Sequence, residues 1–443
     1  MKYYPENIDA DLCDTVIYSF ADIRENKLVE FEKNDPDLWE RILTLKSDHP
    51  DLKLLLAVGG WTQASTSFSP MTSTQQNRAI FINSAVDLLK SYSFDGLDID
   101  WEYPALRGGN ADDKANLVEL LREMKPEFDK NNLIITIAIG AGADTVDTSY
   151  DLANIHKYVD HISAMTYDFY VCGGTAPIEH QAYLQPREGM SNSNYCTAKS
   201  MEYMESKGVP NNKLVMGLPL YGRVYGVSTN NAQFGDIPSG SCPAFEYTRQ
   251  AGMAAYYEIC PLLDSDVTSN YDSNLEVPYA VGSGMFIGYD DPRSLKAKVK
   301  YAMDKGYKGV MVWSLDFDDF NGICGSPYPL LNAIKEEIGQ GSGTVYTTIE
   351  EGAQPSSTQV TEPDGNSESI ITTTESDTNL PPITTHKPQG SNCNEDQVFY
   401  ADKSSGCKDF YSCWTGNFFA TCPENTLFSD EAQACDWANN VKC

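Results

Sequence analysis

The fold is decided by one stretch of the chain, Phe94-Asp95-Gly96-Leu97-Asp98-Ile99-Asp100-Trp101-Glu102-Tyr103-Pro104. Side chains alternate between the two faces of an extended strand, so Asp98, Asp100 and Glu102 share one face. Three carboxylates in one row repel one another, and we therefore expect part of the set to keep a proton near neutral pH. A retained proton is what a general acid requires.

Around this stretch, short β-branched apolar runs alternate with longer amphipathic segments, from residue 15 to about residue 338. This order predicts an α/β fold with a parallel sheet, closed as a barrel or doubly wound. One expected helix spans 73–91, with a capping box formed by Thr72 and Gln75, and another spans 113–130. The expected strands are 15–21, 52–59, 94–101, 133–139, 161–167, 213–220 and 309–315.

An acidic face also occurs on strands of antiparallel sheets that are open to solvent, so the alternation alone has a purely structural interpretation. A strand of a parallel α/β barrel has no solvated face, and its C-terminal end is where such folds keep their chemistry. Buried carboxylates without a function would be costly. The neighbouring pattern therefore favours a catalytic site.

Composition limits the function classes. The 443-residue chain has a formal net charge of -31 at pH 7, which disfavours a nucleic-acid partner because phosphates would be repelled. No apolar run is long enough to cross a membrane. Six of the 12 cysteines lie within residues 393–443, a density typical of a disulfide-stapled secreted module. No apolar segment of a signal peptide follows Met1, so we expect a secreted, extracellular protein whose N-terminal sequence is incomplete here.

Three further segments differ in composition. Residues 224–289 are too long for an ordinary loop and predict an inserted α+β subdomain within a barrel of residues 1–338. Residues 339–390 are rich in Thr, Ser, Pro and acidic residues and predict a flexible linker. Residues 391–443 form the cysteine-rich module, which we expect to be small and built from β-strands.

The segment from Asp95 to Glu102 resembles the DxxDxDxE signature of family 18 glycoside hydrolases, the chitinases. Four more segments resemble motifs of that family in the same order, at residues 53–61, 165–169, 217–223 and 309–316. The likeness covers nearly all of residues 4–338. It implies a TIM (β/α)8-type barrel that needs neither a metal nor another cofactor.

The resemblance implies substrate-assisted catalysis, in which the N-acetyl oxygen of the sugar attacks the anomeric carbon. Glu102 would protonate the leaving oxygen and then activate water. Asp100 would orient the acetamido group and share a proton with Asp98, while Tyr167 and Asp168 would steady that group and tune the acid.

The matching motifs also imply a set of substrate-binding residues, with Trp313 as the floor under the reacting sugar. Isolated aromatic residues in strands are more often plain core, but within matching motifs we favour substrate contact. The set is Phe20, Gly60, Trp61, Tyr103, Met165, Tyr221, Arg223 and Trp313.

The chain departs from the family pattern at its start, where the first barrel strand is missing. Seven strands remain, which predicts an open seam with two exposed strand edges or a truncated sequence. The family partner of Cys13 would lie on the missing strand. Among the other cysteines, Cys260 and Cys324 match a family pair, and a bridge between Cys172 and Cys196 is expected.

A second departure follows Asp168. Many relatives carry a Trp a few residues beyond the motif, whereas this chain has Val171-Cys172-Gly173-Gly174. The subsite for the leaving group is therefore expected to be weaker.

The spacing of the last six cysteines resembles the peritrophin-A type chitin-binding domain. Six cysteines admit 15 pairings, and spacing alone does not choose among them. The resemblance implies Cys393 with Cys413, Cys407 with Cys443, and Cys422 with Cys435.

Aromatic rings in so small a module cannot all be buried. We expect Trp414 and Phe418 to contact the ligand, while Phe399 and Tyr411 fit core and contact equally well.

The sequence therefore predicts a secreted, monomeric endo-chitinase whose partner is chitin or chito-oligosaccharides. One alternative is a non-catalytic chitin lectin, which the presence of Glu102 disfavours. Another is an endo-β-N-acetylglucosaminidase acting on glycoprotein glycans, for which a chitin-binding tail would have little purpose.

Overall fold

The computed structural model describes residues 1–173, 176–190, 192–339 and 344–350, and five short strands between residues 399 and 437. The chain divides into two compact units, residues 1–356 and residues 357–443. No helix in these described parts is long and apolar enough to cross a membrane.

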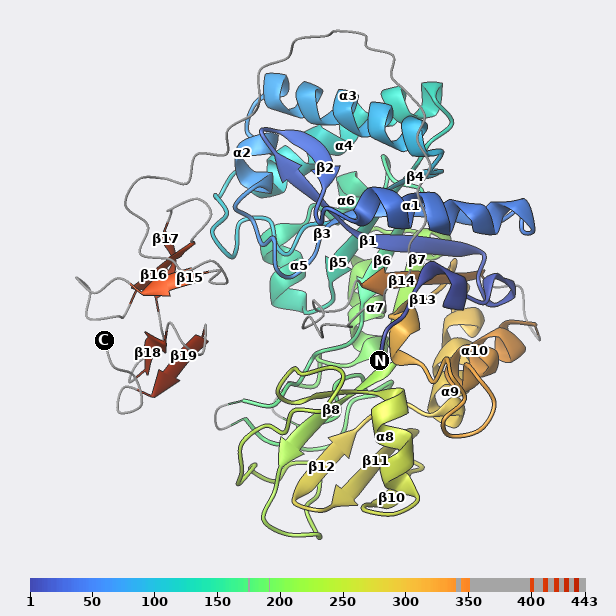
Figure 1. The fold of residues 1–443 in the computed structure, drawn as a ribbon, viewed down its shortest axis with the longest axis vertical. Coiled ribbons are helices and arrows are strands. Elements are labelled where there is room, and N and C mark those ends of the chain that lie inside the picture. Colours follow the sequence, from blue (N-terminus) through green and yellow to red (C-terminus); the bar gives the residue numbers. More distant parts are fainter. Residues whose placement is uncertain are drawn as a thin grey trace, which may run out of the picture. The chain divides into compact units, whose positions relative to one another are not determined.

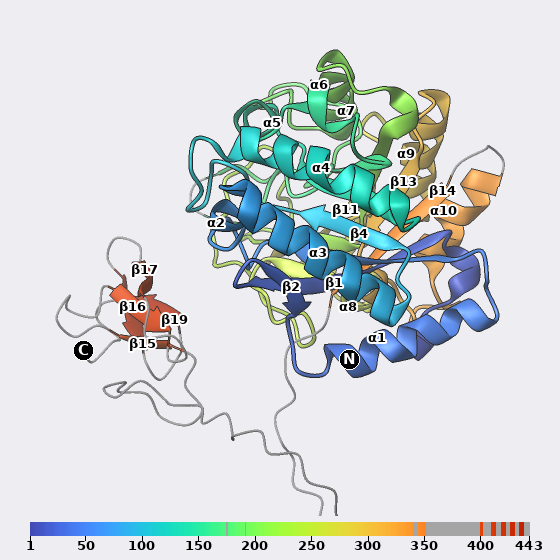
Figure 2. The same ribbon diagram turned by 90° about the horizontal axis from the view of Figure 1, so that it is seen from above.

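The first unit is built around eight parallel strands (Figures 1 and 2). Each pairs in parallel with the next, and the last also pairs with the first, so the sheet closes on itself. This confirms the predicted barrel-type α/β fold. A short strand, β2 (Lys27–Glu30), adds antiparallel to β1. The eight are β1 (Thr15–Arg24), β3 (Lys53–Gly59), β4 (Gly96–Asp100), β5 (Ile134–Gly140), β6 (His161–Met165), β7 (Leu214–Pro219), β13 (Gly309–Trp313) and β14 (Thr344–Glu350).

The eighth strand, β14, corrects the expectation of an open seam. It lies between β13 and β1, with Thr347 in register with Val312 on one side and Val16 on the other. The edges of two parallel strands present unpaired backbone groups, and a β-branched segment that follows the last barrel helix pairs with both. The segment 344–350, which we expected to belong to the linker, is therefore part of the barrel, while residues 351–390 lie outside the described part of the chain.

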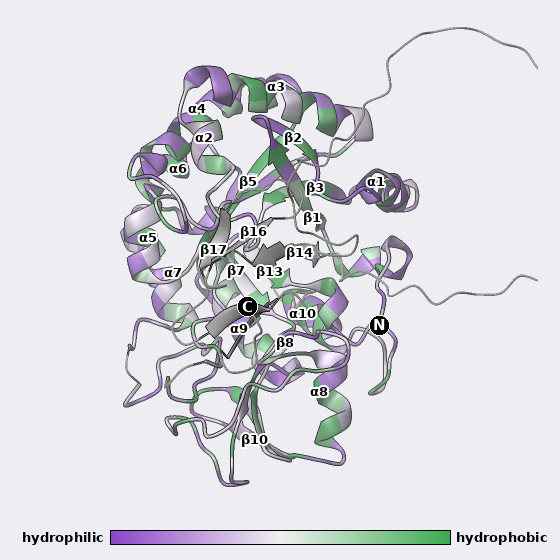
Figure 3. Cartoon of the chain, turned by 60° about the vertical axis from the view of Figure 1, so that its left-hand side comes forward, coloured by the Kyte–Doolittle hydropathy of each residue, from purple (hydrophilic) through white to green (hydrophobic). Residues whose placement is uncertain are grey.

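Helices cover the outside of the sheet, and α3 and α4 lie side by side (Figures 1 and 2). Hydrophobic and hydrophilic residues alternate along both of them (Figure 3), as expected for helices with one face on a core. The helices of the barrel are α1 (Asp35–Leu43), α2 (Phe68–Thr72), α3 (Gln75–Tyr92), α4 (Asp113–Lys130), α5 (Ala143–Ser149), α6 (Leu152–Ile155), α7 (Thr197–Ser206), α9 (Pro292–Asp304) and α10 (Pro329–Gly339). Short 3-10 turns occur at Pro5–Asn7, Ala10–Leu12, Thr44–Ser47, Asn211–Lys213 and Leu315–Phe317.

The start of α3 differs from the prediction. Thr74 is the N-cap, and its side chain accepts a hydrogen bond from the Asn77 backbone N–H. Thr72 instead ends the preceding helix, where its hydroxyl bonds to the Phe68 carbonyl at 3.0 Å. The predicted capping box is wrong because this extra short helix takes up Thr72.

The main hydrophobic core lies between the sheet and its helices. Leu97, Ile99 and Trp101 of the acidic segment are fully buried in it. The alternate residues point to the other side, where Asp98 pairs in register with Ala57 of β3 and Thr136 of β5. The carboxylates of the segment therefore face the interior of the barrel.

A second sheet lies between β7 and β13 in the chain, where we expected a subdomain. Its strands run in the order β10-β11-β12-β8-β9, and all pairs are antiparallel. This sheet and its helix lie together below the parallel sheet, on the side away from α3 (Figure 1). Its elements are β8 (Tyr221–Gly226), β9 (Met253–Ala255), α8 (Tyr256–Leu263), β10 (Thr268–Asp272), β11 (Val277–Gly282) and β12 (Met285–Gly288).

Two disulfides tie the inserted segment to loops of the barrel, one through a loop cysteine, Cys242, and one through Cys260 of α8. Cys260 joins Cys324, the pair that the family resemblance implied. Cys172 joins Cys242 rather than Cys196, so the expected bridge between Cys172 and Cys196 is wrong. The inserted segment brings Cys242 to Cys172 across 70 residues, while Cys196 is buried at the start of α7 with its thiol bonded to the Ser193 carbonyl.

In the second unit, the structure describes a three-stranded sheet and a two-stranded sheet, both antiparallel. The strands are β15 (Phe399–Ala401), β16 (Asp409–Ser412), β17 (Phe418–Thr421), β18 (Thr426–Ser429) and β19 (Ala434–Trp437). Trp414, the side chain of Phe418 and the pairings of the six C-terminal cysteines lie outside what the structure describes.

Candidate active site

The three carboxylates at the end of β4 are buried, with exposed fractions of 3% for Asp98, 6% for Asp100 and 7% for Glu102. The Thr136 hydroxyl on β5 donates a hydrogen bond to Asp98. Burial raises the pKa of Asp98 to about 6, against the opposing effect of that hydrogen bond. Asp98 therefore becomes mostly protonated only as the pH falls below about 6.

The pKa of Glu102 is raised to near neutral pH. Burial raises the pKa of Glu102 to about 7, a hydrogen bond from Tyr103 and the charge of Arg107 lower it, and the charge of Asp168 raises it. A carboxyl group with a pKa near the working pH can both release and recover a proton.

Beyond the carboxylates, the carboxyl end of β6 and the start of β8 contribute a second polar group. Arg223 donates two hydrogen bonds to Asp168, at 2.7 Å from Nε and 2.6 Å from Nη2. The rings of Tyr167 and Tyr221 lie edge to face at 6.4 Å between centroids. Burial holds the pKa of both phenols well above the usual value, so both remain neutral O–H groups.

Aromatic rings from β1 and β13 lie next to each other in the barrel. Phe20 and Trp313 stack with ring centroids 5.8 Å apart. Met165 packs in the same inner cluster as Trp313 and Tyr167. The predicted floor residue thus lies on the same inner side of the sheet as the carboxylates.

Gly60 acts through its backbone. Its N–H donates to the Asp100 carbonyl at 2.8 Å, and its φ is 79°. A side chain here would place a Cβ 2.6 Å from the Phe20 ring, so only glycine permits this approach. Gly60 thus lets β3 end close to Phe20 and Asp100, and its role in substrate binding stays a prediction.

Trp61 stands apart from the other predicted residues. It is 64% exposed, and its indole is covered on one face by the guanidinium of Arg107. Tyr103, in contrast, is half-buried beside Glu102.

The family model described as glycosyl hydrolases family 18 matches residues 1–318, which include all of these side chains. The chain belongs to glycosyl hydrolases family 18. A second model, for the chitin binding Peritrophin-A domain, matches residues 393–443, so this family 18 chain also carries a C-terminal chitin-binding domain.

Similar proteins include chitinases and a pseudo-chitinase. An endochitinase of Manduca sexta is 31% identical over 511 residues, covering 99% of this chain and 91% of that protein. The Group IV chitinase of Ostrinia furnacalis in complex with allosamidin is 35% identical with a TM-score of 0.74, covering 77% of this family 18 chain and 95% of that chain. Human YKL-39, described as a pseudo-chitinase with retained chitooligosaccharide binding properties, is 33% identical with a TM-score of 0.71, covering 76% and 94%.

Two residues of this family 18 site were missed in the sequence. Thr136 lies opposite Asp98 on the neighbouring strand, a relation that only strand register reveals. Arg107 lies five residues beyond Glu102, and its Nη1 donates to the Glu102 carbonyl at 2.9 Å. Nothing in the sequence predicted a role for Arg107 in this site, except that it lies close to Glu102 along the chain.

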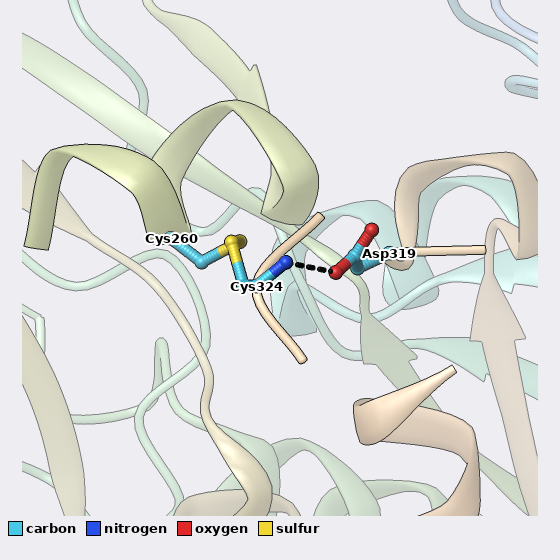
Figure 4. A group of neighbouring side chains, drawn as sticks. All are labelled: Cys260, Asp319 and Cys324. Carbon is cyan, nitrogen blue, oxygen red and sulfur yellow. Dashed lines mark hydrogen bonds between the residues drawn. A yellow bond between two sulfur atoms is a disulfide. The ribbon is translucent and has the colours of Figure 1, made fainter. Parts of the chain in front are cut away.

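A cluster of metal-ligand residue types also lies in the family 18 unit, at Cys260, Asp319 and Cys324 (Figure 4). The two cysteines form a disulfide and offer no thiolate. Asp319 accepts hydrogen bonds from the backbone N–H groups of Ile323 and Cys324, each at 2.8 Å. The cluster therefore fastens a loop rather than presenting ligands to an ion.

Proposed function

We propose that this protein is an endo-acting chitinase that hydrolyses β-1,4-N-acetylglucosamine linkages with retention of anomeric configuration. The observation that carries the proposal is Glu102, a buried carboxyl with a pKa of about 7 at the end of the family's signature segment. A group of this kind is protonated often enough at neutral pH to act as an acid, and ionises readily enough to act next as a base.

In the proposed reaction the substrate supplies the nucleophile. The N-acetyl carbonyl oxygen bonds to the anomeric carbon as the glycosidic bond breaks, and the Glu102 proton moves to the leaving oxygen. Glu102, now ionised, then takes a proton from water as that water opens the oxazolinium ion. Two displacements at one carbon restore the original configuration.

The other groups would stabilise the charge that develops. Asp100 would accept a hydrogen bond from the acetamido N–H, and Asp98, with its raised pKa, would share a proton with it. Tyr167 would donate its neutral O–H to the acetamido oxygen, while Trp313 would stack on the apolar face of the reacting sugar.

The organisation that we propose for the whole protein is a catalytic barrel, a linker and a chitin-binding module that acts outside the cell. The module would keep the barrel close to an insoluble polymer and so raise the effective substrate concentration. This arrangement fits chitin better than the glycans of soluble glycoproteins, where such a tail would have little use.

The test of catalysis compares wild type with Glu102→Gln. Wild type should release soluble N-acetylglucosamine oligomers from colloidal chitin, and Glu102→Gln should lower release by about a thousandfold or more, because the proton donor is lost. Glu127→Gln, which changes an exposed carboxylate on α4, is the matched control and should remain active.

A chitin lectin is the second candidate, because one solved relative is described as a pseudo-chitinase that retains chitooligosaccharide binding. Folded wild-type protein that binds oligomers but releases none would establish the lectin and end the chitinase proposal.

A further inference from the structure

One side chain, Arg107, contacts both the backbone of Glu102 and the exposed indole of Trp61. Its guanidinium carbon lies 3.5 Å from the centroid of the Trp61 ring. Its Nη1 donates a hydrogen bond to the Glu102 carbonyl at 2.9 Å. A planar guanidinium is suited to such a double contact, because it stacks through its face and donates through its edge.

The loop that carries Arg107 is tied to the loop that carries Trp61 through Ser65. The Ser65 hydroxyl is fully buried and lies 2.8 Å from the Tyr103 carbonyl and 2.7 Å from the Leu106 carbonyl. It also accepts a hydrogen bond from the Trp101 indole N–H at 2.8 Å, and the Ser65 N–H donates to the Arg107 carbonyl at 3.3 Å. The loops after β3 and β4 are therefore held as one unit.

A second anchor fixes the far side of the same loop. Asp113, at the start of α4, has no exposed surface and accepts hydrogen bonds from the Asn110 N–H at 2.7 Å and the Ser69 hydroxyl at 2.7 Å. The Ala105 N–H approaches the same carboxylate at 3.3 Å. With both ends of the loop fastened, the position of Arg107 relative to Glu102 is set by the fold rather than by the substrate.

Trp61 itself is far more exposed to solvent than the buried residues that anchor these loops. It is 64% exposed, and the contact with Arg107 covers one face of its ring. The stacked pair holds the indole in one orientation, with its other face available to an apolar sugar surface.

We propose that Arg107 is a positioning residue that holds the Trp61 indole at a set place relative to Glu102, so that the free indole face stacks on a sugar remote from the bond that is cut. This inference rests on the proposed function. It assigns the pair a specificity role, because only oligomers long enough to reach both Glu102 and Trp61 gain from it. Short oligomers at the carboxylates do not contact the indole.

The experiment measures the binding of chito-oligosaccharides, from the dimer to the hexamer, by calorimetry on full-length protein carrying Glu102→Gln. Adding Arg107→Met should weaken binding of the longest oligomers by about three- to fivefold, the value of an exposed cation–π contact, and leave the dimer unchanged. Arg107→Lys keeps the charge and lacks the planar guanidinium, so the same loss with length is expected. Equal loss for short and long oligomers, or no loss for either variant, would overturn the role.

A double-mutant cycle separates positioning from a general loss of structure. Trp61→Ala should produce the same length-dependent loss, and Trp61→Ala combined with Arg107→Met should lose no more than Trp61→Ala alone. Additive losses would show that Arg107 does not act through Trp61 and would overturn the inference.

The same inference predicts which of the two kinetic constants, KM or kcat, depends on oligomer length in the active enzyme. With Arg107→Met, KM should rise for long oligomers and not for short ones, while any change in kcat that follows from the altered pKa of Glu102 should be the same at every oligomer length. A lower kcat with KM unchanged would contradict it. If wild type cuts no chitin, the proposed function fails, while the binding series still decides the role of Arg107.

Discussion

At the scale of single residues, the pKa of Glu102 is set by one strong effect and several weaker ones. Burial is the largest influence and raises the pKa, while charged and hydrogen-bonding neighbours adjust the result. The carboxyl thus titrates near neutral pH because the protein excludes water from it, as expected for a group in a site of low dielectric constant. Glu102 interacts electrostatically with Tyr103, Arg107, Tyr150, Tyr167 and Asp168.

The pH dependence of hydrolysis should follow this titration. A general acid is active when protonated, so kcat/KM on a soluble oligomer should fall as the pH rises through about 7. Removing the cation with Arg107→Met should move this alkaline limb to higher pH, and removing the anion with Asp168→Asn should move it to lower pH. Shifts of the same sign in the two variants would contradict the assignment of the limb to Glu102.

At the scale of secondary-structure elements, the closing strand β14 has the greatest consequence. It pairs with both β1 and β13, the strands that carry Phe20 and Trp313. The register places Thr348 beside Trp313 and Glu350 beside Ser19. The strand therefore holds the two strands that carry Phe20 and Trp313 at a fixed spacing.

A proline within β14 tests this strand. Thr347→Pro removes a backbone donor from a strand that is paired on both sides, so it should lower the free energy of unfolding by about 2 kcal/mol. Denaturant titration of the barrel would measure the change. Thr361→Pro, in the second unit, is the control, and equal midpoints for the two variants would mean that β14 contributes no pairing to the barrel.

At the scale of the whole molecule, the protein combines two units that match two different families. The first belongs to a family of glycosyl hydrolases, and the second carries a chitin-binding domain. In the proposed function, attachment through one chain lets the second unit keep the first close to a large, insoluble substrate.

Removing residues 391–443 should therefore separate two activities. Retention on insoluble chitin should fall by about tenfold or more, while hydrolysis of soluble short oligomers should remain unchanged. A pull-down assay beside an oligomer assay would measure both, and Trp414→Ala would serve as a point-mutation counterpart. Equal retention of the full and shortened proteins would remove the role of the module.

Some residues of the candidate site could be predicted from the sequence, and others could not. The three carboxylates, Tyr167, Asp168 and Trp313 lie in segments with recognisable spacing, and strand periodicity alone places the carboxylates on one face. Thr136 and Arg107 could not be predicted, because a strand register and a loop conformation bring them to Asp98 and Glu102. The bridge between Cys172 and Cys242 was missed for the same reason, since it depends on where an inserted segment lies.

Local periodicity and motif spacing by themselves determined the α/β class, the inward row of acids and the presence of two units, because these follow from short-range patterns along the chain. The closure of the barrel, the pairing of the cysteines and the contacts of the Arg107 guanidinium with Glu102 and Trp61 follow from the folded chain alone. Those contacts link residues that are distant in the sequence or held by loop geometry, and their energies depend on the packing of the complete chain.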